Sequence, residues 1–250
     1  MPNDRLTKIA NYIISQEKVS IDELVEKFKV SKITIRRDLD KLEKKNIITK
    51  IYGGAQANSG GINDFETRAN LLRNEKQYIA QKAALSINSG DSIFMDGGTT
   101  ASFIFNYLDK NSSFTLLTNS LDAINKAVTF PNILILIVGN SYDRNIHSFI
   151  NLNHVTKDFS NITIDKAFIT CSGVSIESGL SNKHPIVAGI KSMMCSIAKE
   201  VYLLADNSKF DKVSLMTFYN LEDVDKIFTD KKPNDKYMNF FEKNNIEPIF

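Results

Sequence analysis

Six short apolar runs between residues 92 and 229 each end in a small polar or glycine-containing loop. They cover residues 92–95, 114–117, 133–138, 166–171, 201–205 and 226–229, and a helical pattern usually follows. Strands that alternate with helices are typical of parallel βαβ units. We therefore expect residues 75–250 to form an open α/β domain.

The first 57 residues show a different pattern. Apolar side chains at helical spacing predict helices over residues 5–16 and 20–28, the second opened by a capping box from Ser20 to Glu23. Ser31 can cap a third helix over residues 32–45, in which Ile35, Leu39 and Leu42 share the buried face. Residues 47–55 read as a β-hairpin with a glycine turn. Three helices and a hairpin predict a winged helix-turn-helix domain.

Charge supports DNA as the partner of this domain. Residues 1–55 hold 12 Lys and Arg against 8 Asp and Glu, although the whole chain has a net charge of only +2. The alternative is a small helical bundle with a solvated basic face. Ile33 argues against that alternative, because a large apolar residue suits an exposed surface poorly but suits contact with a thymine methyl group.

The segment Val30–Leu39, followed by Gly53, Gly54 and Ala55, resembles the DeoR family of bacterial transcription regulators. Many members carry Arg and His in the wing where this chain has Lys50 and Tyr52. The predicted partner is double-stranded operator DNA. The residues expected to contact it are Ser20, Ser31, Lys32, Ile33, Thr34, Arg36, Arg37, Lys41, Lys44, Lys50 and Tyr52.

Residues 56–62 are small, polar and glycine-rich, which is typical of a flexible joint. We therefore divide the chain into a winged helix-turn-helix domain at 1–57, a linker at 58–74 and an effector-sensing domain at 75–250. Paired DNA half-sites need paired heads, so we expect a homo-oligomer.

The loops that follow the apolar runs predict a ligand site. In open α/β sheets, ligands bind beyond the carboxyl ends of the strands. Five of these loops supply hydroxyls, amides, glycines, two acids and one lysine, Lys209, which suits a polyol that carries a phosphate. The alternative is that each loop uses these residue types only to cap the following helix.

The second domain also resembles the DeoR family, in DGGTT at 96–100, LLTNS at 116–120, SGVSIESGL at 172–180 and LLADNSKF at 203–210. The resemblance implies a fold like ribose-5-phosphate isomerase, a phosphorylated sugar as the effector, and repression of a carbohydrate operon. Members usually have glycine where Asn140 and Asn151 stand, and many have an acidic residue where Val187 stands. The implied effector-binding residues are Asp96, Gly97, Gly98, Thr99, Thr100, Thr118, Asn119, Ser120, Gly139, Ser172, Gly173 and Lys209.

Other classes of protein fit less well. The rival reading is a sugar-phosphate isomerase with Asp96 or Asp206 as its base, but a winged helix would serve no purpose in an isomerase. Cys171 and Cys195 form no CxxC pair and His147, His154 and His184 are scattered, so we expect no catalytic residue, metal or cofactor. Lys191 could reach the ligand site or lie on a solvated helix face. Without a membrane-length apolar run or a secretory signal, we expect a cytoplasmic protein.

Overall fold

The computed structural model describes residues 2–58, 65–159 and 161–250. Its contacts divide the chain into two compact units, Met1–Leu72 and Arg73–Phe250. Residues 59–64 of the predicted linker at 58–74 lie outside the described residues.

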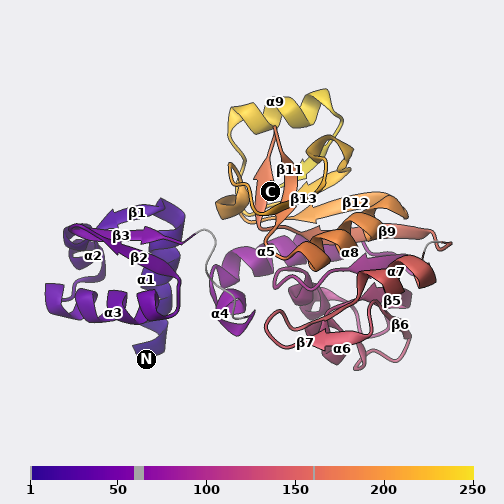
Figure 1. Ribbon diagram of the computed structural model, residues 1–250, viewed down its shortest axis with the longest axis horizontal. Helices are drawn as coiled ribbons and strands as arrows, with labels where there is room; N and C mark the ends of the chain where they lie inside the picture. Colours follow the sequence, from indigo (N-terminus) through magenta and orange to yellow (C-terminus); the bar gives the residue numbers. More distant parts are fainter. Residues whose placement is uncertain (1, 59–64, 160) are drawn as a thin grey trace. The chain divides into compact units, whose positions relative to one another are not determined.

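The first unit contains the predicted helices and wing (Figure 1). Helices α1 (Pro2–Gln16), α2 (Ile21–Phe28) and α3 (Lys32–Lys44) pack on one another, and strands β2 (Ile48–Ile51) and β3 (Gly54–Ala57) form the antiparallel wing. Ile9, Ile13, Leu24, Ile35, Leu39 and Leu42 are buried at its centre. A short helix, α4 (Phe65–Asn70), completes the unit.

A third strand, β1 (Lys18–Ser20), was not predicted and pairs with β3 in the order β1-β3-β2. Gly54 explains why the strands can approach so closely, since a Cβ at that position would overlap the Val19 carbonyl oxygen. The winged helix-turn-helix prediction is confirmed.

The second unit is built on a seven-stranded sheet in the order β15-β14-β12-β9-β4-β5-β6, in which every neighbouring pair is parallel. All six predicted apolar runs contribute a strand. The strands are β4 (Ser92–Met95), β5 (Phe114–Thr118), β6 (Ile133–Ile137), β9 (Ile164–Thr170), β12 (Ala198–Leu204), β14 (Lys226–Phe228) and β15 (Glu247–Ile249). The predicted open α/β architecture is confirmed, and β15 is an addition at one edge.

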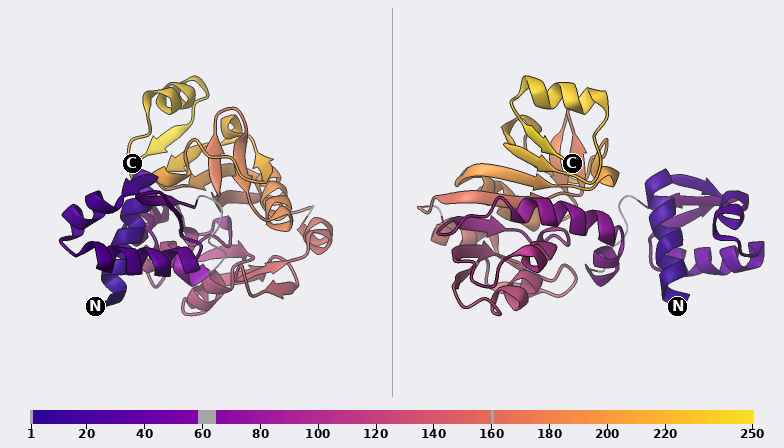
Figure 2. Two further views of the ribbon diagram at one scale, coloured as in Figure 1. Left: turned by 60° about the vertical axis from the view of Figure 1, so that its left-hand side comes forward. Right: turned by 180° about the vertical axis from the view of Figure 1, so that it is seen from behind.

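Helices cover both faces of this sheet. Successive strand residues alternate between the two faces, so Ile93 and Met95 pack in one apolar cluster and Phe94 packs in the other. The first cluster is closed by α5 (Arg73–Ala84), the 3-10 helix η1 (Ala101–Tyr107) and α6 (Leu121–Ala127). The second is closed by α7 (Leu152–Phe159), α8 (Pro185–Ser196) and α9 (Asp235–Lys243). Figure 2 shows α9, in yellow, beside the end of the sheet that contains β15.

Two small antiparallel sheets grow from loops at the carboxyl ends of the parallel strands. The hairpin β7 (Ser141–Asp143) and β8 (Ser148–Ile150) follows β6. Strands β10 (Gly173–Ser175), β11 (Gly179–Asn182) and β13 (Met216–Tyr219) form the other sheet, and the 3-10 turns η2 (Asn207–Lys209) and η3 (Leu221–Asp223) lie in the loops around it. These insertions border the carboxyl ends of the parallel strands, where the sequence predicts a ligand site.

Candidate functional site

Helix α3 presents a basic face whose other side is fixed in the core. Ser31 caps the helix, since its Oγ accepts a hydrogen bond from the Thr34 N–H at 3.2 Å. Ile33 is 64% exposed, as an outward position near the helix start requires. The basic residues of α3 that are expected to contact DNA are all exposed, namely Lys32, Arg36, Arg37, Lys41 and Lys44.

A buried carboxylate sets the position of α3 against α1. Asp38 is 3% exposed, and its Oδ2 lies 2.9 Å from Arg5 Nε. This ion pair was not predicted, although Asp38 is three residues from Ile35 and so shares the buried side of the helix. The pair holds the outward face of α3 in a defined orientation within the first unit.

The wing places its two candidate residues differently. Tyr52, at the hairpin turn, is fully exposed. Lys50 Nζ instead lies 2.7 Å from Asp40 Oδ1 and 3.1 Å from Glu43 Oε2. The hydrogen bond that Lys50 donates lowers the pKa of Asp40, and the hydrogen bonds that both carboxylates accept raise the pKa of Lys50. Lys50 therefore ties the wing to α3, and its charge is largely balanced inside the unit.

Two other candidates in the head have local partners. Lys32 Nζ lies 2.5 Å from Asp22 Oδ1 across the turn between α2 and α3, and both side chains are exposed. Ser20 caps α2 by accepting a hydrogen bond from the Glu23 N–H at 3.1 Å.

In the second unit, Asp96 follows β4 and braces the strand ends around it. It is 1% exposed, and its carboxylate accepts hydrogen bonds from the N–H groups of Gly98 and Thr170, each at 2.8 Å. The Thr170 hydroxyl also donates to it, at 2.9 Å. The amide N–H of Gly98, one of the implied effector-binding residues, thus already donates to Asp96.

Lys191 completes this arrangement. Its Nζ lies 2.5 Å from Asp96 Oδ2 and donates to the Thr170 carbonyl oxygen at 2.6 Å, with a side chain only 4% exposed. The solvated-face alternative for Lys191 is therefore wrong. Helical spacing could have predicted that Lys191 is buried, because it shares one face of α8 with Val187, Ala188, Met194 and Cys195, which are all buried.

The loop Gly97–Thr100 is held on both sides by hydroxyl groups. A Cβ on Gly97 would overlap Ser148 Oγ, and one on Gly98 would overlap Thr170 Oγ1. Thr99 and Thr100 are buried at the start of η1. Both glycines are therefore required by close packing.

Of the three polar side chains at the end of β5, two form structural hydrogen bonds and the third has an acceptor without a partner among the described residues. Thr118 Oγ1 donates to the Met95 carbonyl oxygen at 2.6 Å, and Ser120 caps α6 by accepting from the Ala123 N–H. Asn119 is 1% exposed, yet its Oδ1 has no hydrogen-bond partner among the described residues. Asn119 is thus the polar side chain of this loop that remains available for a ligand.

The hairpin β7–β8 borders this loop. Phe149 N–H donates to the Asn119 carbonyl oxygen at 2.7 Å, and Ser120 forms an antiparallel bridge with Ser148. Gly139 has φ +99° and leaves no room for a side chain beside the backbone of Ile150. Two departures from the family pattern meet at the base of the hairpin, where Asn151 Nδ2 donates to Asn140 Oδ1 at 2.9 Å.

Charged groups gather where β12 and β9 end. Burial acts to raise the pKa of Asp206, but the charges of Lys209 and Lys76 and hydrogen bonds from Ser208 outweigh it, so the pKa is lowered. Lys209 is half-buried, and its ammonium group forms no hydrogen bond or ion pair within the described part of the chain. Burial raises the pKa of the Cys171 thiol to about 12, despite the opposing charges of Lys191 and Lys209. Cys171 is therefore an unreactive thiol beside these charges.

The order of the strands brings most of the predicted effector residues to one edge. Asp206, Asp96 and Asn119 follow β12, β4 and β5, and β9 lies between β12 and β4. Gly173 begins β10 of the adjoining small sheet instead, and Ser172 directly precedes this strand. Ser172 N–H donates to the Ser181 carbonyl oxygen at 2.8 Å, and Gly173 packs against the Lys212 carbonyl.

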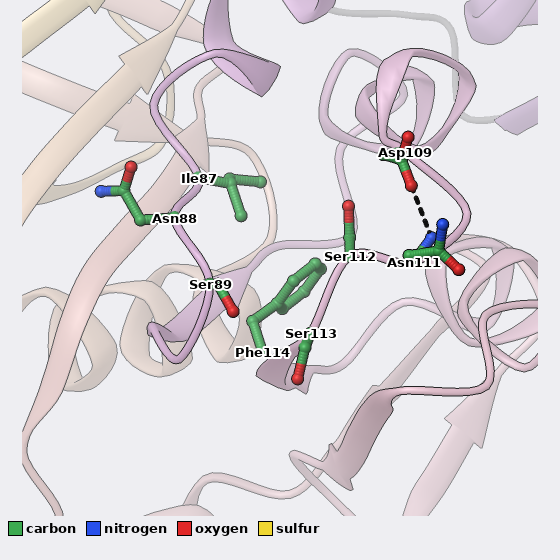
Figure 3. A pocket seen from close by; sticks show the side chains of 8 residues that line it. All are labelled: Ile87, Asn88, Ser89, Asp109, Asn111, Ser112, Ser113 and Phe114. Carbon is green, nitrogen blue, oxygen red and sulfur yellow. Dashed lines mark hydrogen bonds between the residues drawn. The ribbon is translucent and has the colours of Figure 1, made fainter.

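A separate pocket of about 220 Å³ lies at the opposite edge of the sheet (Figure 3). Its lining residues precede β4 and β5, so it opens at the amino ends of these strands. Ligands of open α/β sheets bind beyond the carboxyl ends, and we therefore place the candidate site there. The pocket is lined by Ile87, Asn88, Ser89, Asp109, Asn111, Ser112, Ser113 and Phe114.

Among the residues that the structure describes, no group of three or more His, Cys, Asp or Glu side chains is placed to hold a metal ion. None of the helices in those same residues is long and apolar enough to cross a membrane.

Two family models match the chain. The DeoR-like helix-turn-helix domain matches residues 5–60, and the DeoR C-terminal sensor domain matches residues 72–231. The HTH-type transcriptional regulator IolR of Bacillus subtilis is 38% identical over 243 residues, which are 97% of this chain and 96% of that protein. The L-fucose operon activator of Haemophilus influenzae is 30% identical and covers 99% of both chains. The glycerol-3-phosphate regulon repressor of Escherichia coli is also 30% identical, over 96% of this chain and 95% of its own.

Among solved structures, ribose 5-phosphate isomerase A from Methanocaldococcus jannaschii matches with a TM-score of 0.41 and 17% identity. The match covers 55% of this chain and 54% of the isomerase.

Proposed function

Because the chain belongs to the DeoR family of transcriptional regulators, we propose that it represses a carbohydrate-metabolism operon and leaves its operator when it binds a phosphorylated sugar. The DNA-binding surface in this proposal is the exposed face of α3 together with Tyr52 of the wing. The effector site is the edge of the parallel sheet between Asp206 and Asn119.

The observation that carries the sensing proposal is the Lys209 ammonium group, which has no ion-pair partner in the described residues. Lys209 is half-buried, and its charge acts on Asp206. Lys191, a buried lysine among the same strand ends, is already paired with Asp96. Lys209 is therefore a cation that a phosphate group can engage without breaking an ion pair of the described residues.

An isomerase remains the second reading, and one observation weighs against it. A general base must be able to take a proton from its substrate. The Asp96 carboxylate already receives three hydrogen bonds and the Lys191 ammonium group. These contacts support a bracing role for Asp96, and the named relatives are regulators.

The test is an operator titration with and without a panel of sugar phosphates, on the wild type and on Lys209→Ala. An effector acts only through its different affinities for the DNA-bound and DNA-free states. We expect Lys209→Ala to keep its operator affinity while the effector concentration needed for release rises more than about a hundredfold. Lys243→Ala, an exposed lysine of α9, is the control and should behave as the wild type.

Two results would count against the proposal. Release of the Lys209→Ala variant at the wild-type effector concentration would remove Lys209 from the site. If no sugar phosphate releases even the wild type, the effector class is wrong.

A further inference from the structure

We propose that Asn119 selects the effector by accepting a hydrogen bond from one of its hydroxyl groups. This inference rests on the proposed function and assigns a chemical role to one end of the same site. It starts from the Asn119 Oδ1 atom, which is buried and has no hydrogen-bond partner among the described residues. Buried polar side-chain atoms are rarely left unpaired, so such an atom at a site edge points to a ligand.

The orientation of the amide is fixed by its surroundings. Asn119 Nδ2 donates to the Phe149 carbonyl oxygen at 3.4 Å. Rotating the amide by half a turn would set Oδ1 against that carbonyl, acceptor against acceptor. The Asn119 backbone is held as well, because its carbonyl oxygen accepts from the Phe149 N–H. The acceptor is therefore presented in one direction before a ligand arrives.

That direction leads toward the glycine loop after β4. A Cβ built on Gly97 would overlap Ser148 Oγ and lie 3.7 Å from Asn119 Oδ1, so both side chains border Gly97. Ser148 occupies the neighbouring position, but its hydroxyl donates to the Ile146 carbonyl oxygen at 3.1 Å. Asn119 Oδ1 is thus the acceptor beside Gly97 that has no hydrogen-bond partner among the described residues, and a ligand hydroxyl can supply that partner.

The chemistry of this acceptor constrains the ligand. A carbonyl oxygen attracts a hydroxyl or N–H donor and repels a phosphate oxygen. Lys209 follows β12, and two strands, β9 and β4, lie between β12 and β5. The anionic group and the recognised hydroxyl must therefore sit at separate places on the effector. Sugar phosphates whose free hydroxyl lies away from the phosphate fit this requirement.

The experiment compares a sugar phosphate with its monodeoxy analogues. The panel contains ribose 5-phosphate, glucose 6-phosphate and fructose 6-phosphate, and binding is followed by thermal stabilisation of the full chain. For the sugar phosphate that stabilises the wild type, we expect one monodeoxy analogue to bind about tenfold more weakly or worse. Asn119→Leu should bind the parent and that analogue equally. Asn111→Leu, at the opposite edge of the sheet, should keep the wild-type discrimination.

Each result decides the question. Retention of the full discrimination by Asn119→Leu would overturn the assignment of Asn119, while leaving the proposed function intact. Equal binding of the parent and every monodeoxy analogue by the wild type would overturn it too. If no sugar phosphate stabilises the wild type, the proposed function itself fails. Should Asn119→Leu not fold, Asn119→Ala is read in the same way.

Discussion

At the scale of single residues, the buried pair of Lys191 and Asp96 is the contact with the largest expected effect on stability. Removing one partner of a buried ion pair typically costs about 3–5 kcal/mol, because a charge is left without compensation. We expect Lys191→Met to lower the free energy of unfolding of the second unit by about 3 kcal/mol, as measured by urea denaturation.

Two variants check this interpretation. Adding Asp96→Asn to Lys191→Met should restore part of the loss, because the uncompensated carboxylate is then removed. Lys199→Met breaks an exposed pair with Asp165 and should cost about 1 kcal/mol or less. If Lys191→Met and Lys199→Met lower the free energy of unfolding equally, burial of the Lys191–Asp96 pair does not increase its contribution to stability.

Asn151 carries strain that a glycine would relieve. Its φ is +134°, a region that favours glycine. Asn151→Gly and Asn151→Ala both remove the hydrogen bond to Asn140 Oδ1, so their difference reports the backbone alone. We expect the glycine variant to be more stable than the alanine variant by about 1 kcal/mol in thermal or urea unfolding. Equal stability of the two variants would show that the backbone is not strained at this position.

At the scale of elements, α3 and the wing should contribute unequally to DNA binding. The exposed Lys41 is free to neutralise a phosphate, whereas Lys50 is shared with Asp40 and Glu43. We expect Lys41→Ala to lower the slope of log affinity against log salt by about one unit. Lys50→Ala should change that slope less. A larger change for Lys50 would mean that its ion pairs open when DNA binds.

Asp165 joins three strands of the main sheet and makes their stability depend on pH. Hydrogen bonds from Lys199 on β12 and from Ser92 on β4 lower the pKa of this carboxyl group on β9. A pKa below the unfolded value of about 4 stabilises the fold above that pH, and this stability disappears as the pH falls further. We expect Asp165→Asn to be less stable than the wild type at pH 7, with a difference that shrinks towards pH 3 in thermal unfolding. A difference that does not change with pH would contradict this assignment.

The sequence pattern predicted the long helices and the strands of the main sheet better than the short strands inserted between them. Strands such as β4 and β9 each contain an apolar run, at 93–95 and 167–169, because both faces are buried there. Helices α2 and α3 of the head each open with a capping serine. The β7–β8 hairpin and β1 gave no such signal. Each of these strands is only three residues long. β1 pairs with β3, which is distant in the sequence, and β7 and β8 pair with each other.

The candidate site shows the same division. Asp96 and Asn119 could be placed at one edge because the carboxyl ends of parallel strands meet there. Lys191 lies on α8, in a different βα unit from Asp96, and only tertiary packing sets their ion pair. The sequence also could not reveal which polar groups are occupied, as the contrast between Thr118 and Asn119 shows.

At the scale of the whole molecule, the proposed function requires more than one head. A single winged helix contacts too few base pairs to single out an operator, and paired half-sites need paired domains. We expect light scattering to give a mass of at least twice 28.2 kDa for the full chain, both free and on operator DNA. A mass of one chain under both conditions would contradict the oligomer.

The tightly packed glycines of the proposed effector site bear on how such a sensor could evolve. A substitution at Gly97 or Gly98 would collide with Ser148 or Thr170 and disturb the loop before it could alter selectivity. Asn119 Oδ1 and the Lys209 ammonium group differ from these glycines, since neither forms a hydrogen bond within the described residues. A lineage could therefore acquire a new inducer through changes at these two positions while the loop backbone stays constant. Effector specificity would then change through single side chains at positions 119 and 209, while the glycine loop keeps its backbone.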